Sequence, residues 1–502
     1  MADRSDAARK QIVIIGGGTA GWMAATLMQH HLGPQGFAIT LIESPQIGII
    51  GVGEGSTPQL RQFFDTLGIA ESEWMPACNA TYKNGIRFEG WGHRAESDHY
   101  FHPFPSLPDR QTAGLFLQHC FQRRQGIDVH AHPDAFFLAA HLAEHRLSPL
   151  SHEGQYLGVS YAYHFDSALL GQFLGKIARS RGIRHIQANV TEVQCHTSGA
   201  ISAVQLDSGE DLQAELFVDC SGFRGLLIQQ ALHEPFVPFA DNLFNDSAIA
   251  IPSAVEPCPG TQTSSVAMQA GWRWHIPLTS RVGNGYVYSS SYISADQAET
   301  ELRSELGLLD SDVEARHLKM KVGRLANHWV KNCLAVGLSQ GFIEPLEATA
   351  LHLVQETISS FCSAFIAGQC SALHRDEFNQ RINARFEGIR DYIVCHYKVN
   401  GKEGQYWQDN RDNTLLSDNL QAVLDSWQRG QDITQTINSR NMAQYYPSVS
   451  WHCLLAGYGV FPTPNSPPPA NAVQLKQQVA QAIAEMAKRF AHQADVLIAT
   501  SA

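Results

Sequence analysis

A short apolar run followed at once by a glycine-rich turn is the feature that most constrains this fold. Ile12 to Ile15 are four consecutive apolar residues, as in a parallel strand that is buried on both faces. The turn Gly16-Gly17-Gly18-Thr19-Ala20-Gly21 fits the G-x-G-x-x-G pattern, and an apolar helical stretch from Trp22 to Met28 follows it. Strand, turn and helix in this order predict the start of a Rossmann-type α/β fold that binds a dinucleotide.

The residues of this turn have separate tasks in such a site. Gly16 permits the tight bend, Gly18 lets the backbone approach a pyrophosphate, and Gly21 lets the helix pack close to the strand. The free N–H groups at the helix N-terminus favour phosphate. A second strand, Ala38 to Ile42, ends in Glu43, which is placed to bind an adenosine ribose hydroxyl. The alternative is a glycine-rich turn without a ligand, and the strand–turn–helix context favours the dinucleotide.

Length and charge limit the remaining possibilities. The 502 residues suggest two or three structural units, and Lys+Arg of 36 against Asp+Glu of 48 gives a net charge of −12. Such an acidic chain is a poor partner for nucleic acid or an anionic membrane. Met1 to Lys10 contain no apolar signal segment, and no apolar run is long enough to span a bilayer, so we expect a cytoplasmic protein. The ten scattered cysteines form no C-x-x-C pair and indicate reduced thiols, with no metal site.

Two stretches after Glu43 bear on the cofactor and on the chemistry. Four glycines between Gly48 and Gly55 imply backbone lying close to a ligand, or a mobile loop, and their position directly after the ribose-binding strand favours cofactor contact. Lys83 stands just before an alternating strand that starts at Ile86. Taken alone, a single lysine in that position is most often a solvated surface charge.

These stretches, together with a later tryptophan pair, resemble a known family. Gly16 to Ala25, Gly51 to Pro58 and Lys83 before Gly85-Ile86 are similar to segments of the flavin-dependent halogenases, the tryptophan-halogenase family. Trp272-Arg273-Trp274-His275-Ile276-Pro277 matches the W-x-W-x-I-P signature of that family. The resemblance extends over nearly the whole chain.

The resemblance implies an α/β fold of the FAD-binding flavoprotein-monooxygenase type (Rossmann-type) with an added, mostly helical C-terminal part. It implies a discontinuous FAD-binding unit at residues 10–105 and 150–360, with substrate-pocket insertions, and a helical part at residues 361–502 that completes the pocket. A last helix is expected from Ala472 to Ala491. The implied FAD-binding residues are Gly16, Gly18, Thr19, Ala20, Gly21, Glu43, Gly51, Val52, Gly53, Glu54, Val193, Gly337, Leu338 and Ile343.

The resemblance also implies the catalytic and halide-binding residues. The catalytic lysine of the family corresponds to Lys83, and its catalytic glutamate falls on Glu347. The backbone N–H groups that bind chloride or bromide fall on Thr349 and Ala350. Tryptophan-specific members read L-E-S-T-G where this chain reads Leu346-Glu347-Ala348-Thr349-Ala350, so a methyl group is added near the halide.

Two segments resemble the substrate pocket of the family. His102 and Phe104 would flank a flat aromatic substrate next to Glu347, although a histidine packed in an aromatic core is an equally good interpretation of the residues alone. In the carboxy-terminal segment, Trp451 and His452 stand where tryptophan-specific members carry a Tyr-Tyr pair that holds the amino-acid end. This departure favours an indole, or another electron-rich arene, over free tryptophan.

The implied reaction is electrophilic aromatic halogenation. Reduced FAD and dioxygen oxidise a halide to hypohalous acid, which travels past Trp272 and Trp274 to Lys83. There the ammonium group can hydrogen-bond the acid, or a neutral amine can form a haloamine; the residues leave both open. Glu347 is expected to accept the arenium proton with a modestly raised pKa, and Glu344 is a nearby carboxylate that motif alignment ranks lower.

No second dinucleotide pattern follows the first, which fits a protein that receives reduced FAD from a separate flavin reductase. A homodimer is a further expectation. The main alternative is a single-component FAD-dependent aromatic monooxygenase (hydroxylase), which leaves Lys83 and the tryptophan pair unexplained. A catalytically inactive relative that only binds flavin or a partner is a second alternative, and the presence of Lys83 and Glu347 argues against it. The substrate is either a free small arene or one tethered to a carrier protein.

Overall fold

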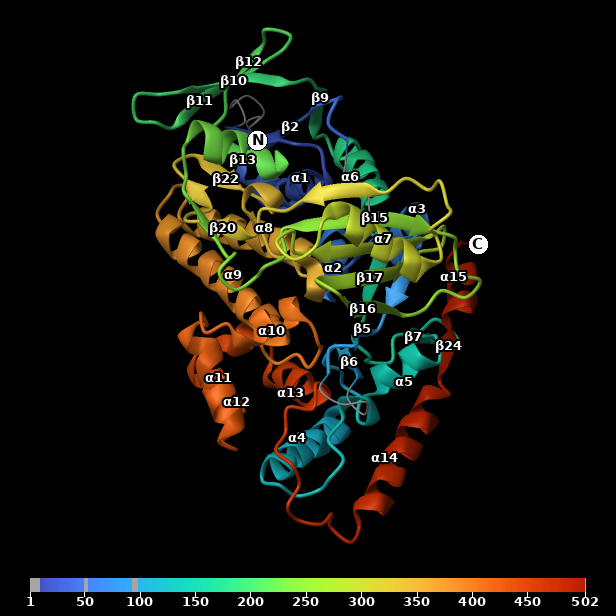
Figure 1. The fold of residues 1–502 in the computed structure, drawn as a ribbon. Coiled ribbons are helices and arrows are strands. Elements are labelled where there is room, and N and C mark those ends of the chain that lie inside the picture. Colours follow the sequence, from blue (N-terminus) through green and yellow to red (C-terminus); the bar gives the residue numbers. More distant parts are fainter. Residues whose placement is uncertain (1–9, 49–52, 93–97, 502) are drawn as a thin grey trace.

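A six-stranded sheet holds the glycine-rich turn at its centre in the computed structural model, which describes residues 10–48, 53–92 and 98–501 (Figure 1). All neighbouring strands are parallel except β21 and β22, which pair antiparallel. In spatial order the strands are β21 (Trp329–Val330), β22 (Cys333–Ala335), β13 (Leu216–Asp219), β1 (Lys10–Ile15), β2 (Phe37–Glu43) and β9 (Arg184–Gln187).

The continuous apolar run of β1 follows from burial on both faces. Ile12 and Ile14 belong to the large hydrophobic core that also contains the residues of helix α1 (Thr19–Leu32). Val13 and Ile15 belong to a second cluster on the other face, together with residues of β11 (Ile201–Leu206). Because each face of the strand meets apolar side chains, the stretch from Ile12 to Ile15 shows no alternation of apolar and polar residues.

A seven-stranded sheet carries the tryptophan pair, with β16 and β5 parallel and its other neighbours antiparallel. Its strands are, in spatial order, β19 (Arg316–Lys319), β15 (Ser247–Ser253), β18 (Val282–Tyr288), β17 (Gly271–Pro277), β16 (Gln262–Met268), β5 (Gly85–Glu89) and β6 (His99–Pro103). A three-stranded antiparallel sheet beside it consists of β3 (Gly53–Gly55), β8 (Ala162–Asp166) and β4 (Thr81–Lys83). The predicted lysine therefore lies at the end of β4.

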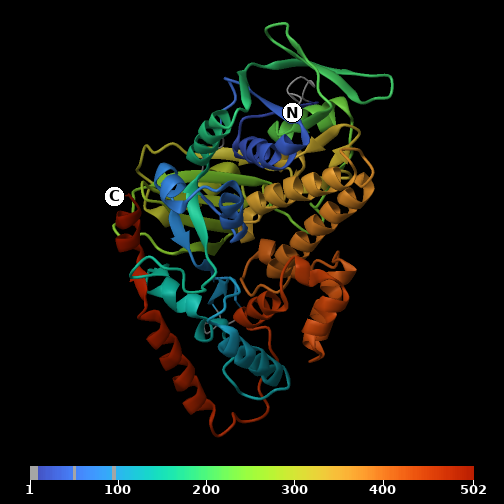
Figure 2. The same ribbon diagram turned by 180° about the vertical axis from the view of Figure 1, so that it is seen from behind.

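Helices cover the parallel sheet and build the C-terminal part, so the predicted mixed α/β class with a helical C-terminal part is confirmed (Figures 1 and 2). Those of the first 360 residues or so are α1, α2 (Gln59–Leu67), α3 (Glu71–Ala77), α4 (Arg110–Arg124), α5 (Leu138–Glu144), α6 (Ser167–Ser180), α7 (Ala295–Leu306) and α8 (Ala350–Ala367). The later ones are α9 (Arg375–Lys398), α10 (Gln405–Asp412), α11 (Asp418–Gln428), α12 (Ile433–Ser439), α13 (Ser448–Gly457), α14 (Ala472–Ala487) and α15 (Gln493–Ser501).

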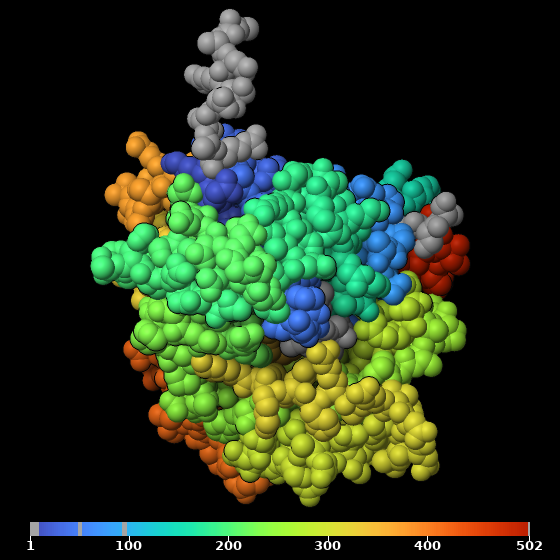
Figure 3. Space-filling model, turned by 90° about the horizontal axis from the view of Figure 1, so that it is seen from above, coloured from blue at the N-terminus to red at the C-terminus, as the bar shows by residue number. Residues whose placement is uncertain are grey.

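The remaining strands form small sheets and edges. The pair β10 (Val190–Cys195) and β11, with β12 (Asp211–Leu212), extends to one side of the face seen in Figure 3. A second small sheet contains β14 (Phe236–Pro238), β20 (Gly323–Leu325) and β23 (Gly341–Phe342). A third pairs β7 (Leu147–Ser151) with β24 (Phe490–His492).

The end of the chain differs from the prediction. The last helix was expected to reach Ala491, but α14 ends at Ala487 and the residues from Phe490 form β24 instead. The apolar residues Phe490 and Ala491 are buried where the chain returns to β7, beside the main body of the molecule (Figure 1). A long-range strand pairing thus replaces the helix that local pattern alone favoured.

Other expectations concern boundaries and segments. The domain division stays a prediction, and α8 runs continuously across its expected boundary at residue 361. Gly51 and Val52 lie outside the described residues. All ten cysteines are free thiols, as predicted, and six of them are buried. Within the described ranges, no helix is both long enough and apolar enough to cross a bilayer.

Candidate active site

The glycine-rich turn has the geometry that a dinucleotide requires. Gly16 has φ +115°, and a Cβ there would lie 2.2 Å from the carbonyl oxygen of Cys220. A Cβ on Gly21 would lie 1.9 Å from the carbonyl oxygen of Gly16, so the helix reaches the strand only because this side chain is absent. A Cβ on Gly18 would meet no protein atom within 4 Å, so the backbone there is accessible. The turn therefore leaves open the backbone that a dinucleotide pyrophosphate would approach, and its contacts with FAD stay a prediction.

Asp219 lies beside this turn, at the end of β13 and opposite Ile15 of β1. Its Oδ1 accepts hydrogen bonds from the Ser221 N–H at 2.9 Å, the Ser221 hydroxyl at 2.6 Å and the Ser339 hydroxyl at 3.0 Å. Its Oδ2 accepts from the backbone N–H groups of Leu227 and Ile228 at 2.8 and 2.9 Å. One buried carboxylate thus holds the end of β13 against the strand-end turn that contains Ser339.

The segment that begins at Gly337 lies directly against the glycine-rich turn. Gly337 has φ +70°, and a Cβ there would lie 2.8 Å from the Cβ of Ala20, at the start of α1. Leu338 follows in the same short 3-10 helix, and buried Ile343 lies just after β23. These predicted flavin residues are therefore brought next to the predicted phosphate site, although they are more than 300 positions away in the chain.

The other expected cofactor residues occupy different positions. Glu43 lies at the end of β2, where its Oε2 is 2.9 Å from Nε2 of His185, a partner that the sequence did not indicate. Gly53 and Glu54 lie on β3. Val193 lies on β10, half-buried against the second hydrophobic cluster.

Helix α8 starts at the predicted halide residues. Thr349 is its N-cap residue and Ala350 its first residue, so free backbone N–H groups and the positive end of the helix dipole lie here. The hydroxyl Oγ1 of Thr349 is buried and has no hydrogen-bond partner among the described residues. Unpaired donors at a helix N-terminus fit an anion such as a halide.

Lys83 is fully buried rather than solvated. Its exposed fraction is 0%, and its Nζ donates a hydrogen bond to the carbonyl oxygen of Ser56 at 3.0 Å. The ring centroid of Phe104 lies 5.8 Å from Nζ. Burial lowers the pKa of Lys83 to about 7, and the negative charge of Glu347 opposes part of that fall. A cation in so dry a place indicates chemistry rather than solubility.

Glu347 is held as a carboxylate by two histidines. Both of its oxygens lie 3.1 Å from Nδ1 of His102, and Oε1 lies 2.9 Å from Nε2 of His396. Burial by itself raises the pKa of Glu347, but the charge and hydrogen bonds of these histidines outweigh burial and lower the pKa to about 2. The expectation of a modestly raised pKa is therefore wrong, because it did not include the histidine pair.

His396 is the main residue of the site that sequence reasoning missed. It lies on α9, is fully buried, and has Nδ1 at 2.7 Å from the hydroxyl of Tyr458. Burial lowers the pKa of His396, and its hydrogen bond to Glu347 acts in the opposite direction. A histidine within an apolar helix face gives no local sign of a carboxylate partner, so the sequence carried no signal for it.

Glu344 has a different set of contacts from Glu347. Its Oε2 accepts hydrogen bonds from Asn245 Nδ2 at 2.7 Å, Tyr397 OH at 2.9 Å and Trp272 Nε1 at 3.1 Å. Its other oxygen is buried without a partner in the described part of the chain, and burial raises the pKa of Glu344. This carboxyl group orients the first tryptophan of the W-x-W pair.

The predicted substrate residues separate into two groups. His102 and Phe104 lie beside Glu347 and Lys83, respectively, as expected of a pocket wall. Trp451 is one ring further away, with its ring centroid 4.9 Å from that of Tyr392, which lies 5.8 Å from the ring of His102. His452 contacts Trp427, with ring centroids 5.7 Å apart, and its Nδ1 is 2.9 Å from the carbonyl oxygen of Ser448. These contacts attach His452 to the C-terminal helices rather than to Lys83 or Glu347.

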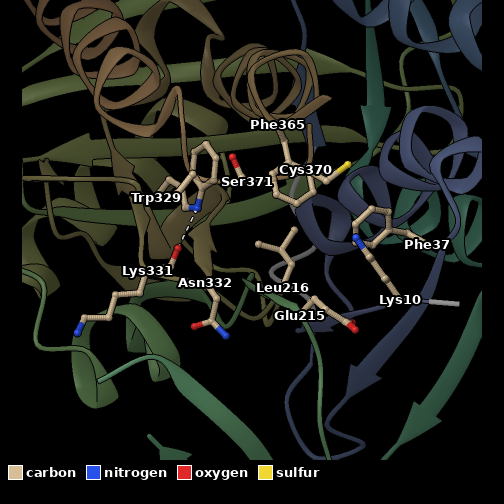
Figure 4. Close-up of a pocket in the computed structure, with 11 residues that line it drawn as sticks. Lys10, Phe37, Glu215, Leu216, Trp329, Lys331, Asn332, Phe365, Cys370 and Ser371 are labelled. Carbon is tan, nitrogen blue, oxygen red and sulfur yellow. Dashed lines mark hydrogen bonds between the residues drawn. The ribbon is translucent and has the colours of Figure 1, made fainter. Parts of the chain in front are cut away.

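A separate cavity of about 190 Å³ lies at the amino-terminal ends of the parallel strands (Figure 4). Lys10, Glu215 and Asn332 line it, and each lies at or just before the start of a parallel strand. Cofactors of such folds bind beyond the carboxyl ends of the strands, where the glycine-rich turn is. This cavity is therefore not the FAD site.

Comparison with known sequences assigns the chain to a family. The family model described as tryptophan halogenase matches residues 11–474. The chain is 37% identical over 490 residues to the 7-chloro-L-tryptophan 6-halogenase KtzR of Kutzneria sp. (strain 744), covering 91% of this chain and 92% of that protein. It is 34% identical to the tryptophan 7-halogenase RebH of Lentzea aerocolonigenes, covering 93% of each.

Solved structures agree over nearly the full length. The tryptophan 6-halogenase SttH of Streptomyces toxytricini superposes with a TM-score of 0.86 at 35% identity, covering 98% of this chain and 100% of that one. BrvH, a flavin-dependent halogenase from Brevundimonas sp. BAL3, gives a TM-score of 0.83 at 31% identity, covering 98% and 99%. These relatives give no support to the hydroxylase alternative. The chain belongs to the tryptophan halogenase family and is a flavin-dependent halogenase, an enzyme that uses reduced FAD for electrophilic halogenation of an aromatic ring.

Proposed function

We propose that this enzyme chlorinates or brominates an electron-rich arene such as an indole, with Lys83 presenting hypohalous acid and Glu347 accepting the proton lost by the ring. The observation that carries the proposal is the burial of both groups in one interior, where the charge of Glu347 acts on Lys83. A buried cation and a buried carboxylate both lower the stability of the fold. Their presence in the interior therefore indicates a role in the reaction.

Reduced FAD, once bound, supplies with dioxygen the oxidation of halide to hypohalous acid. The protein residues proposed to hold FAD are those of the glycine-rich turn and of the segment from Gly337 to Ile343. The N-terminus of α8, with Thr349 and Ala350, is the proposed halide site. It is supported by the N–H groups of the first helical turn and by the Thr349 hydroxyl, which has no partner in the described part of the chain. Chloride and bromide both suit such a site.

Glu347 is suited to the last step of the reaction. An arenium ion is a far stronger acid than any carboxylic acid, so a carboxylate with a pKa of about 2 still takes its proton. His102 and His396 keep that carboxylate ionised and fix its position. In the complete reaction the O–X bond breaks as the C–X bond forms, and the displaced oxygen takes a proton from the Lys83 ammonium and leaves as water. The C–H proton then passes to Glu347, so the proton that Lys83 loses is balanced by the one that Glu347 gains.

The proposed substrate is an indole, or a similar arene, without a requirement for the amino-acid end of tryptophan. Support comes from Trp451 and His452, which replace the Tyr-Tyr pair and have buried contacts with Tyr392 and Trp427. The relatives named tryptophan halogenases make tryptophan the competing candidate. A separate flavin reductase as supplier of reduced FAD, and a homodimeric state, complete the proposal.

The test is a mass-spectrometric assay with FAD, an unrelated flavin reductase, NADH, a halide, and indole beside tryptophan. We expect a halogen isotope pattern on indole in preference to tryptophan, and its loss in Lys83→Ala, which should still bind FAD. Regioselective halogenation by Lys83→Ala would contradict the role of the lysine, and preference for tryptophan would contradict the substrate assignment. Consumption of NADPH by the purified protein alone, with hydroxylated product, would contradict the halogenase itself.

A further inference from the structure

A row of three residues crosses the three-stranded sheet next to Lys83. Gly55 on β3 pairs with His164 on β8, and His164 pairs with Thr81 on β4. Thr263 reaches the same place from β16 of the large sheet, with its hydroxyl 2.9 Å from Nε2 of His164. His164 and Thr81 are fully buried, and 8% of Thr263 is exposed.

The direction of the hydrogen bonds along this row follows from the number of protons. The Thr81 hydroxyl donates its only proton to the carbonyl oxygen of Pro277 at 2.8 Å. It therefore accepts its second hydrogen bond, and Nδ1 of His164 at 3.1 Å must be the donor. Burial and the nearby charge of Lys83 hold the pKa of His164 well below its usual range, so the ring carries one proton only.

The Thr263 hydroxyl is consequently oriented. Since the single ring proton of His164 is on Nδ1, Nε2 is an acceptor and the proton of Thr263 points toward it. The lone pairs of Thr263 Oγ1 are left for a different neighbour. No protein donor to that oxygen is found among the described residues, so a small bound molecule is the natural partner.

Gly55 lies close to both this acceptor and Lys83. The position of a Cβ on residue 55 is 3.1 Å from Lys83 Nζ and 3.1 Å from Thr263 Oγ1. A donor and an acceptor thus both border the position that a side chain of residue 55 would occupy. A single hydroxyl-bearing molecule above Gly55 is within reach of both.

We propose that Thr263 is a second ligand of the oxidant, and that hypohalous acid is held over Gly55 with its oxygen accepting a hydrogen bond from Lys83 and its O–H donating to Thr263. This inference rests on the proposed function and adds residues to it. With both sides of the oxygen engaged, the halogen is the only free end of the molecule. When the arene attacks, the O–X bond breaks, the C–X bond forms, and the oxygen takes a proton from the Lys83 ammonium and leaves as water. Thr263 binds the oxidant directly, and His164 is a positioning residue.

The experiment compares Thr263→Val with Thr263→Ser. Valine keeps the branched shape but removes the acceptor, and serine keeps the acceptor. Both are assayed for halogenated arene per reduced FAD consumed, and for hypohalous acid that escapes to a small scavenger in solution. We expect Thr263→Val to lower product per FAD about tenfold, with a matching rise in scavenger halogenation, and Thr263→Ser to stay near wild type. The matched control is Ser265→Ala, which removes a buried hydroxyl from the same strand and face.

A second variant addresses the space over Gly55. The methyl group of Gly55→Ala would lie 3.1 Å from both polar atoms, so we expect the same escape of oxidant per reduced FAD consumed. Wild-type product ratios in both Thr263→Val and Gly55→Ala would overturn the inference but leave the proposed function intact. If wild-type protein yields neither halogenated arene nor scavenger halogenation, the proposed function itself fails, and with it this inference.

Discussion

The surroundings of Lys83 disfavour its charged form. The resulting loss of folding stability can be measured. The partners of Lys83 are one backbone carbonyl, an aromatic ring and the charge of Glu347, none of which replaces the water that the ammonium group has lost. The reactive group is thereby kept away from solvent, where hypohalous acid would be lost to side reactions. Both the stability and the activity of the enzyme should therefore depend on the protonation of this one amine.

We expect Lys83→Met to show how the protonation of Lys83 affects the free energy of unfolding. The pKa of Lys83 falls from 10.5 to about 7 on folding, so below pH 7 the fold bears the full cost of the charged amine. Between pH 7 and 10.5 the unfolded state binds more protons, and this group raises the free energy of unfolding by up to about 1.4 kcal/mol per pH unit. Methionine removes the cost, so the gain in melting temperature should be larger at about pH 6 than at about pH 9.5. The control is the exposed Lys488→Met, which should show no such trend.

The activity effect is expected in Glu347→Gln. In wild type the ammonium form of Lys83 is lost as the pH rises through about 7, and single-turnover product formation should fall over the same range. Removing the carboxylate lowers turnover by roughly two or more orders of magnitude and, because its charge supports the ammonium form, moves the remaining profile to lower pH. A rate that instead increases through about pH 7 would identify the neutral amine, and hence a haloamine, as the reactive form.

At the scale of elements, the turn between β1 and α1 contains one glycine that the fold requires and another that we expect the cofactor to require. Gly21 is needed for the fold, because a Cβ there meets the Gly16 carbonyl oxygen at 1.9 Å. The fold does not need Gly18 in this way, because a Cβ there would meet no protein atom within 4 Å, and we expect the ligand to need it instead. Two glycines of one motif thus have opposite dependence on bound FAD.

Alanine substitutions test this division. Gly21→Ala should cost roughly 3 kcal/mol of stability and lower the melting temperature even without FAD. Gly18→Ala should leave the melting temperature without FAD unchanged and weaken FAD binding, measured by flavin fluorescence. Equal effects of the two substitutions on stability would show that the space beside Gly18 is not kept for the cofactor.

Elements were also where sequence-based prediction was strongest. The strand at Ile12–Ile15, the helix after the glycine-rich turn and the strand that ends at Glu43 follow from local pattern and agree with the structure, because each depends on neighbours in the chain. β24 did not follow, because it depends on pairing with β7. The site shows the same limit: Lys83 and Glu347 were found through family resemblance, whereas His396 and Thr263 acquire their partners only in the folded chain.

At the scale of the whole molecule, the last segment of the chain supports the strand that carries Lys83. Gln493 is fully buried at the start of α15, and its Oε1 accepts a hydrogen bond from the backbone N–H of Tyr82 at 2.9 Å. Its Nε2 donates to the carbonyl oxygens of Pro259 and Gly260 at 3.0 and 2.8 Å. One side chain therefore fixes β4 to the loop before β16.

Gln493→Ala should remove all three hydrogen bonds and leave buried backbone groups unpaired. We expect a loss of roughly 2–3 kcal/mol in the free energy of unfolding, and lower turnover because Lys83 follows Tyr82 directly. His492→Ala, at the exposed neighbouring position, is the matched control and should change neither quantity. Turnover at the wild-type level in a destabilised Gln493→Ala protein would limit Gln493 to a structural role.

The contact of Tyr82 with Gln493 has a consequence for the order of folding. It joins positions 411 residues apart, so the chain must close a very long loop before this hydrogen bond forms. Contacts of such separation are gained late, after nearby strands and helices have collapsed. The strand of Lys83 is thus expected to reach its final geometry among the last parts of the molecule, and a refolding enzyme should bury its tryptophans before it recovers halogenation.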